Sequence, residues 1–163
     1  DASPTWGTAL VSASVQNATG TSIDFSSIPS WVKRITLSFN GVSTNGTSVL
    51  LVQLGTSGGI VNTGYVCVGS GFGSSIVTVN YTAGFGLQDS NAAAYAYSGN
   101  LVLVNQTGNT WTLNGNLVRS TGSAFGCMSA GSIALANALT TVRLTTVNGT
   151  DAFDAGSINI LYE

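Results

Sequence analysis

Alternation of apolar and polar residues is the clearest pattern in this chain of 163 residues. Within 34–39, apolar residues at the odd positions (Ile35, Leu37 and Phe39) alternate with polar ones. This period of two predicts a strand with one buried and one solvated face. Asn40-Gly41 is expected to end the strand, because both residues tolerate positive φ. We expect this strand to be the central one of a β-sandwich.

Short stretches of the same kind recur along the chain, separated by turns rich in Gly and Asn. Strands are expected at Leu10–Val15, Thr21–Phe25, Ser48–Leu54, Gly64–Gly69, Ser75–Thr82, Asn100–Gln106, Thr110–Leu113, Leu117–Arg119, Leu139–Val147 and Ser157–Tyr162, with one or two more in Phe125–Leu135. About ten such strands predict an all-β domain spanning residues 1–163, an antiparallel β-sandwich or jelly roll.

Three connecting segments carry further expectations. Thr107-Gly108-Asn109 predicts a tight hairpin, and Asn114-Gly115-Asn116 predicts a turn. Ala134–Leu139 is the only stretch with helical composition, and Ala83–Gly99 is the least regular part of the chain. An irregular segment between strands is a natural place for ligand contacts, because loops vary while the scaffold stays fixed.

Several expected strands are apolar on both faces, which is unusual for an antiparallel sheet with one solvated side. They include Val49–Val52, Leu101–Val104 and Ile158–Leu161. Two apolar faces need two covers. Either a third layer or a loop packs on the outside, or a second subunit does.

Charged residues make up only 6% of the chain and the net charge is −2. Nucleic acids and anionic membranes are bound by clustered Lys and Arg, so neither partner is expected. No run approaches the roughly 20 apolar residues that cross a bilayer, so membrane insertion is not expected either. Apolar residues reach 44%, which predicts a folded chain that solvates itself with neutral polar groups.

Candidate chemistry is sparse. The chain has no His, which excludes a His-dependent Ser or Cys triad. Cys67 and Cys127 form no metal set, so we predict neither a metal nor a cofactor; they are either buried free thiols or one disulfide. Asp151 and Asp154 are the only neighbouring acids, and we interpret them as turn residues, with a glycosidic acid pair or a cation site as the alternatives.

Aromatic side chains are the remaining candidates for recognition, since a ring combines an apolar face with a polar tip. Sugar rings stack on such faces while Asp, Asn and Gln bond their hydroxyl groups. Trp31 is expected in the core or at its rim. The predicted ligand-binding residues lie in or beside the irregular segment: Tyr95, Tyr97, Asp89, Asn91 and Trp111.

Two segments resemble a known family. Ile-Pro-Ser-Trp-Val-Lys-Arg-Ile-Thr at 28–36 with Phe-Asn-Gly-Val-Ser-Thr-Asn-Gly at 39–46, and the whole of 142–163, are similar to the C-terminal module of tailed-bacteriophage tail fibre and receptor-binding proteins. The two matches bracket Ile23 to Glu163, while 69–132 carries no matching motif.

The resemblance implies a place and a role and no reaction. It implies a homotrimer at the tip of the virion's tail fibre, joined through residues 1–8 as a linker to an upstream fibre shaft. Its ligand class would be a bacterial surface glycan, lipopolysaccharide or capsule, bound for host attachment without enzyme activity. The alternatives are a structural trimerisation or capping module without its own ligand, and a polysaccharide depolymerase fragment.

Overall fold

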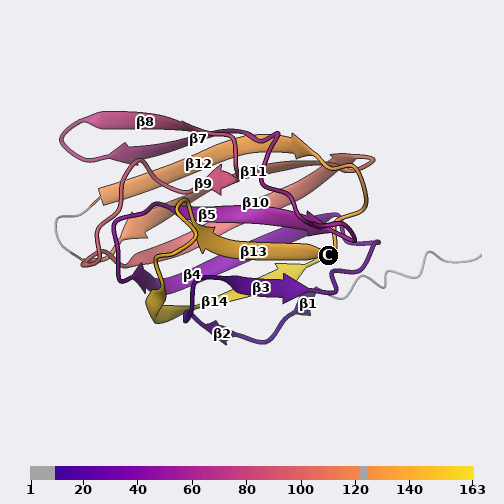
Figure 1. The fold of residues 1–163 in the computed structure, drawn as a ribbon, viewed down its shortest axis with the longest axis horizontal. Helices are drawn as coiled ribbons and strands as arrows, with labels where there is room; N and C mark the ends of the chain where they lie inside the picture. Colours follow the sequence, from indigo (N-terminus) through magenta and orange to yellow (C-terminus); the bar gives the residue numbers. More distant parts are fainter. Residues whose placement is uncertain (1–9, 122–124) are drawn as a thin grey trace, which may run out of the picture.

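A computed structural model describes residues 10–121 and 125–163, so the expected linker at 1–8 lies outside the described residues. The described residues form fourteen strands in two antiparallel sheets and contain no helix (Figure 1). The predicted all-β sandwich is therefore confirmed. Because no helix occurs in this part of the chain, none of it could cross a membrane as a helix.

The long sheet has nine strands. Eight follow one another in space, and the ninth, β2 (Gln16–Asn17), pairs with β14. Their spatial order is β1 (Val11–Ser12), β14 (Phe153–Tyr162), β4 (Arg34–Thr44), β10 (Tyr97–Thr107), β11 (Thr110–Arg119), β12 (Phe125–Ala134), β7 (Val66–Phe72) and β8 (Ile76–Tyr81).

The short sheet has five strands and lies across the long one (Figure 1). Its order is β3 (Ile23–Ser26), β13 (Thr141–Thr146), β5 (Leu50–Thr56) and β6 (Gly59–Ile60), with β9 (Phe85–Gly86) also paired to β5. The sequence pattern did not predict two sheets of such unequal size.

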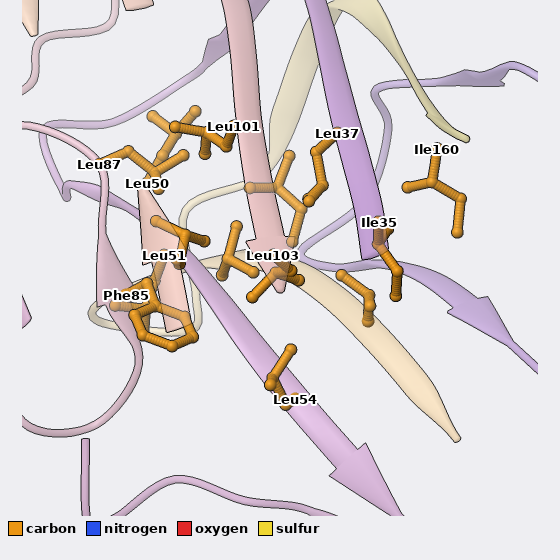
Figure 2. Packing of buried hydrophobic residues seen from close by; sticks show 14 of the residues in the cluster. Ile35, Leu37, Leu50, Leu51, Leu54, Phe85, Leu87, Leu101, Leu103 and Ile160 are labelled. Atoms are coloured by element: carbon orange, nitrogen blue, oxygen red, sulfur yellow. The ribbon is translucent and has the colours of Figure 1, made fainter. Parts of the chain in front are cut away.

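The core fills the space between the sheets. Ile35, Leu37 and Phe39 of β4 are buried, as their alternation predicts, and Leu101 and Leu103 extend the same face on β10. Each such side chain contributes about 1.5–3 kcal/mol relative to an exposed one. Figure 2 shows part of this cluster, in which residues of β4 and β10 meet residues of β5 and β9.

Two expected strand ends are wrong. β4 runs through Asn40-Gly41 to Thr44, because Gly41 (φ 63°) forms a bulge beside Gly156 (φ 87°), where a Cβ on Gly156 would overlap the Gly41 backbone. β11 is one strand through the expected turn at 114–116. Gly115 lies between β10 and β12 and packs closely against Leu101, so Asn114 and Asn116 are outward-facing strand residues.

The remaining expectations have mixed outcomes. β10 and β11 form the predicted hairpin, closed at Gly108-Asn109, and 125–134 is one strand. Residues 135–139 are irregular and not helical. Both cysteines are buried and free, which decides between the two alternatives.

The strands that are apolar on both faces differ in how they are covered: both faces of β5 are buried, whereas the outward face of β10 is partly exposed. On β5, the outward-facing Leu51 is buried under Gly84 of the chain that leads into β9, so a loop covers this strand. On β10, the outward-facing Val102 and Val104 remain partly exposed. We call the side of the long sheet that faces away from the short sheet the outer face.

The last strand of the long sheet, β8, has no neighbour on one side among the described residues. Ile76 is 74% exposed, and Val77 on the opposite face of the strand is also exposed. The tip of the β7–β8 hairpin therefore leaves both faces and one edge open (Figure 1).

Candidate functional site

The predicted ligand-binding segment, 83–99, is only partly irregular. β9 occupies its start and β10 begins at Tyr97, which leaves 87–96 as the loop. Asn91 holds this loop in place, because its Nδ2 donates to Thr44 Oγ1 (3.0 Å) and to the Ser48 carbonyl (2.9 Å). Asn91 is buried, and its role here is to anchor the loop to the β4–β5 connection.

Two of the three predicted aromatic residues have buried rings that a ligand cannot reach. Tyr97 is 1% exposed and its hydroxyl donates to the Ser90 carbonyl at 3.3 Å. Trp111 is 4% exposed and lines a small cavity beside Pro29 and Leu139, at the other end of β11 from Arg119. Stacking needs an open ring face, so we correct the expectation that these two rings contact sugar.

Tyr95 and Asp89 belong to a group that we call the Arg119 cluster: Asp89, Tyr95, Arg119 and Phe125. The Arg119 guanidinium lies 4.0 Å from the Tyr95 ring centroid and 4.7 Å from that of Phe125. These are cation–π distances, so the chain itself occupies a face of the Tyr95 ring.

Asp89 completes the cluster. Its Oδ2 accepts a hydrogen bond from Ser90 Oγ (3.2 Å), while its Oδ1 is buried and has no hydrogen-bond partner among the described residues. Asp89 and Phe125 both pack on Gly71, where a Cβ would overlap them. Asp89, Asn91 and Tyr95 thus lie in the same loop, whereas Trp111 lies in β11 at the end far from Arg119.

Buried titratable groups near this loop are held neutral. Burial, helped by the negative charge of Asp89, raises the pKa of Cys127 to about 12, and burial also raises the pKa of Cys67. Burial raises the pKa of Tyr81 to about 12, and that of Tyr97 further. A thiol reacts as its thiolate, and burial disfavours that form at both cysteines.

The two neighbouring acids have different structural roles. Asp151 accepts hydrogen bonds from Asn148 Nδ2 (2.7 Å) and the Ser48 amide (2.8 Å), and these bonds lower its pKa. These contacts support our interpretation of Asp151 as a turn residue. For Asp154 the interpretation is wrong, because it lies in β14 and accepts a hydrogen bond from Ser43 Oγ of the neighbouring strand β4. The described residues contain no group of three His, Cys, Asp or Glu that could hold a metal.

Sequence reasoning missed the aromatic ring that is most exposed among the described residues. Trp31 is 48% exposed, so it lies at the rim of the core and not inside it, and its ring centroid is 5.9 Å from that of Tyr162. We call this pair the Trp31 corner. The signal was in the sequence, because Pro29-Ser30 directly before the strand places Trp31 on a turn.

The comparisons with known proteins return nothing. No protein-family model matches the chain, and no curated protein and no solved structure is significantly similar to it. The resemblance to tail fibre modules therefore stays a prediction that rests on its two segments alone.

Proposed function

We propose that this chain is the distal module of a phage tail fibre, a homotrimer that binds a bacterial surface polysaccharide (lipopolysaccharide or capsule) during host attachment. It acts at the fibre tip, joined to an upstream shaft, and has no catalytic activity. Support comes from the resemblance at 28–46 and 142–163, from the all-β fold, and above all from the outer face of the long sheet.

The outer face carries exposed apolar residues interspersed with Ser, Thr and Asn. Its residues are connected row by row through the register of six neighbouring strands, β4, β10, β11, β12, β7 and β8. Arg34 is the only charged side chain that this register places there among the described residues. The exposed apolar members are Val66, Val68, Phe72, Ile76, Val104, Val118 and Met128.

The size of this face suits association between copies. Strands about 4.8 Å apart and about seven residues long, at about 3.3 Å per residue, give roughly 650 Å² over six strands. A stable interface takes roughly 800 Å² from each partner. Exposed apolar residues gathered on one face mark interaction sites, and a face with Arg34 as its one charged residue among those described suits a partner with the same surface.

A trimer also suits the ligand class. Single sugar contacts are weak, and three copies held together engage a repetitive polysaccharide with far higher avidity. Neutral hydroxyl and amide groups dominate the surface, and they can exchange hydrogen bonds with sugar hydroxyls without a charged partner.

The outer face equally favours a second candidate, a structural module that trimerises the fibre and has no ligand of its own. The two candidates share the oligomer and differ in glycan binding. A glycan array therefore separates them.

The test begins with light scattering at micromolar concentration. We expect a trimer mass for the wild type and for Val147→Asp, which changes an exposed residue just after β13. We expect Val66→Asp or Met128→Asp to give a monomer, because each puts a charge into the interface. A wild-type monomer would contradict the proposal. Shortening of host polysaccharide that Asp151→Asn abolishes would instead indicate the depolymerase.

A further inference from the structure

The Trp31 ring is held in solvent by a rigid turn. The Val32 amide donates to the Pro29 carbonyl (3.1 Å), and the Ile28 amide donates to the Thr140 carbonyl (3.0 Å). Ile28 and Val32 are buried on either side of the turn, and Pro29 fixes its own φ. A large apolar side chain that could fold back onto the protein is thus fixed in an exposed position.

Tyr162 is positioned just as firmly. The next residue, Glu163, donates its amide to the Arg34 carbonyl (3.0 Å), and its carbonyl accepts from the amides of Lys33 (2.8 Å) and Arg34 (2.9 Å). These bonds fix the end of β14 to the start of β4. The Trp31 and Tyr162 rings are tilted by 48° to each other and do not form a flat stack.

A groove lined by both polar and apolar side chains begins at Tyr162. It has a volume of about 330 Å³, at the lower end of the range for small-molecule sites. Ser14 and Ser26 line it, and Gln16 donates through Nε2 to the Asp24 carbonyl (3.0 Å), which leaves its side-chain oxygen as an acceptor. Hydroxyl and amide groups therefore lie beside the aromatic corner, while the Asp24 carboxylate is bound by Arg143 (2.7 Å).

The backbone at this groove is strained. Ser27 has φ 61° and is the only residue other than Gly with positive φ among the described residues. It links Ser26 of the groove to the turn that carries Trp31. Left-handed backbone at a residue other than Gly persists only where its surroundings impose it, and such residues cluster at ligand sites.

We propose that the Trp31 corner and the adjoining groove form a subsite for one neutral pyranose unit of a glycan. The C–H-rich face of the sugar stacks on Trp31, with Tyr162 closing the angle, and its hydroxyl groups bond to Ser14, Gln16 and Ser26. This inference rests on the proposed glycan-binding function and gives it a location other than loop 87–96.

An array of repeat-unit oligosaccharides from bacterial lipopolysaccharides and capsules identifies a ligand for the full chain. Affinity for that oligosaccharide is then compared among variants. We expect Trp31→Ala to weaken binding about tenfold or more, Trp31→Phe about threefold or less because a ring remains, and Val147→Ala not at all. Binding should shift the tryptophan fluorescence of the wild type and not that of Trp31→Phe.

Each other outcome has a definite meaning. If the wild type binds and Trp31→Ala binds within about twofold of it, the subsite is wrong while the proposed function stands. Loss of binding in Tyr95→Ala or Asp89→Ala would then place the site in loop 87–96. If the wild type binds no oligosaccharide, both proposals fail. A Trp31→Ala variant that loses its trimer mass and keeps its affinity shows that Trp31 packs against another copy, which also overturns the subsite.

Discussion

The Trp31 corner and the Arg119 cluster both place aromatic rings beside polar groups at the surface of the sandwich. In the Arg119 cluster, the guanidinium lies over Tyr95 and Phe125, and Asp89 and Phe125 pack on Gly71. In the Trp31 corner, no cation–π contact to the ring occurs among residues 10–121 and 125–163, and nearly half of Trp31 is exposed. An irregular loop therefore does not by itself offer an aromatic ring to a ligand; what matters is whether the chain already covers the ring.

The largest expected effect comes from alkaline pH, which acts on the buried rings and thiols. Burial raises the pKa of Tyr65 and Tyr81 to about 12, and it raises the pKa of Cys127 to about 12 as well. The unfolded chain loses these protons near pH 9 to 10 while the native chain keeps them. Stability is thus unaffected below about pH 9 and falls by about 4 kcal/mol or more by pH 12.

Urea unfolding at several pH values, followed by tryptophan fluorescence, measures this loss. Tyrosinate absorbance gives the control, because the buried tyrosines should ionise only as the chain unfolds. If all five tyrosines ionise near pH 10 in a chain that stays folded, the buried rings are more accessible than the structure indicates.

The next largest effect tests how tightly the Arg119 cluster is packed. We expect Gly71→Ala to cost about 2–3 kcal/mol, because its Cβ would overlap Asp89 and Phe125 and force the Arg119 cluster apart. Gly58→Ala is the matched control, since its Cβ would meet Thr56 Oγ1 at 3.6 Å, an ordinary contact. Chemical denaturation measures both. A neutral Gly71→Ala would show that the cluster is loosely packed.

The smallest effect compares the two aromatic groups directly. Arg119→Met keeps the apolar stem and removes the charge over two rings, which should cost about 1 kcal/mol. Trp31→Phe should change the free energy of unfolding by no more than about 0.5 kcal/mol, because an exposed ring adds little to the core. The reverse order of these two values would mean that Trp31 is structural.

The fold was readable from the sequence where burial alone decided it. Ile35, Leu37 and Phe39 alternate because one face of β4 is buried, and the Gly108-Asn109 hairpin follows from turn chemistry. Gly41 and Gly115 were misread because a glycine that allows a bulge or a close approach between strands resembles one that ends a strand.

The candidate site was less predictable, because exposure depends on contacts between distant segments. The sequence around Tyr95 does not predict that Arg119 lies over its ring. Likewise, the sequence around Tyr162 does not predict that Trp31 packs beside it. Asp151 was easier, since its partner Asn148 is three residues away and the turn is local. Recognition sites built across strands need the register before they can be located.

The open edge of β8 affects how a single copy of the protein behaves. Natural edge strands are usually blunted by Lys, Pro or a bulge, and the sequence Ile-Val-Thr-Val-Asn-Tyr of β8 contains neither Lys nor Pro. Its register with β7 is regular and shows no bulge. The edge of an isolated copy can therefore pair with an exposed strand of another copy, which is how unprotected sheet edges lead to aggregation.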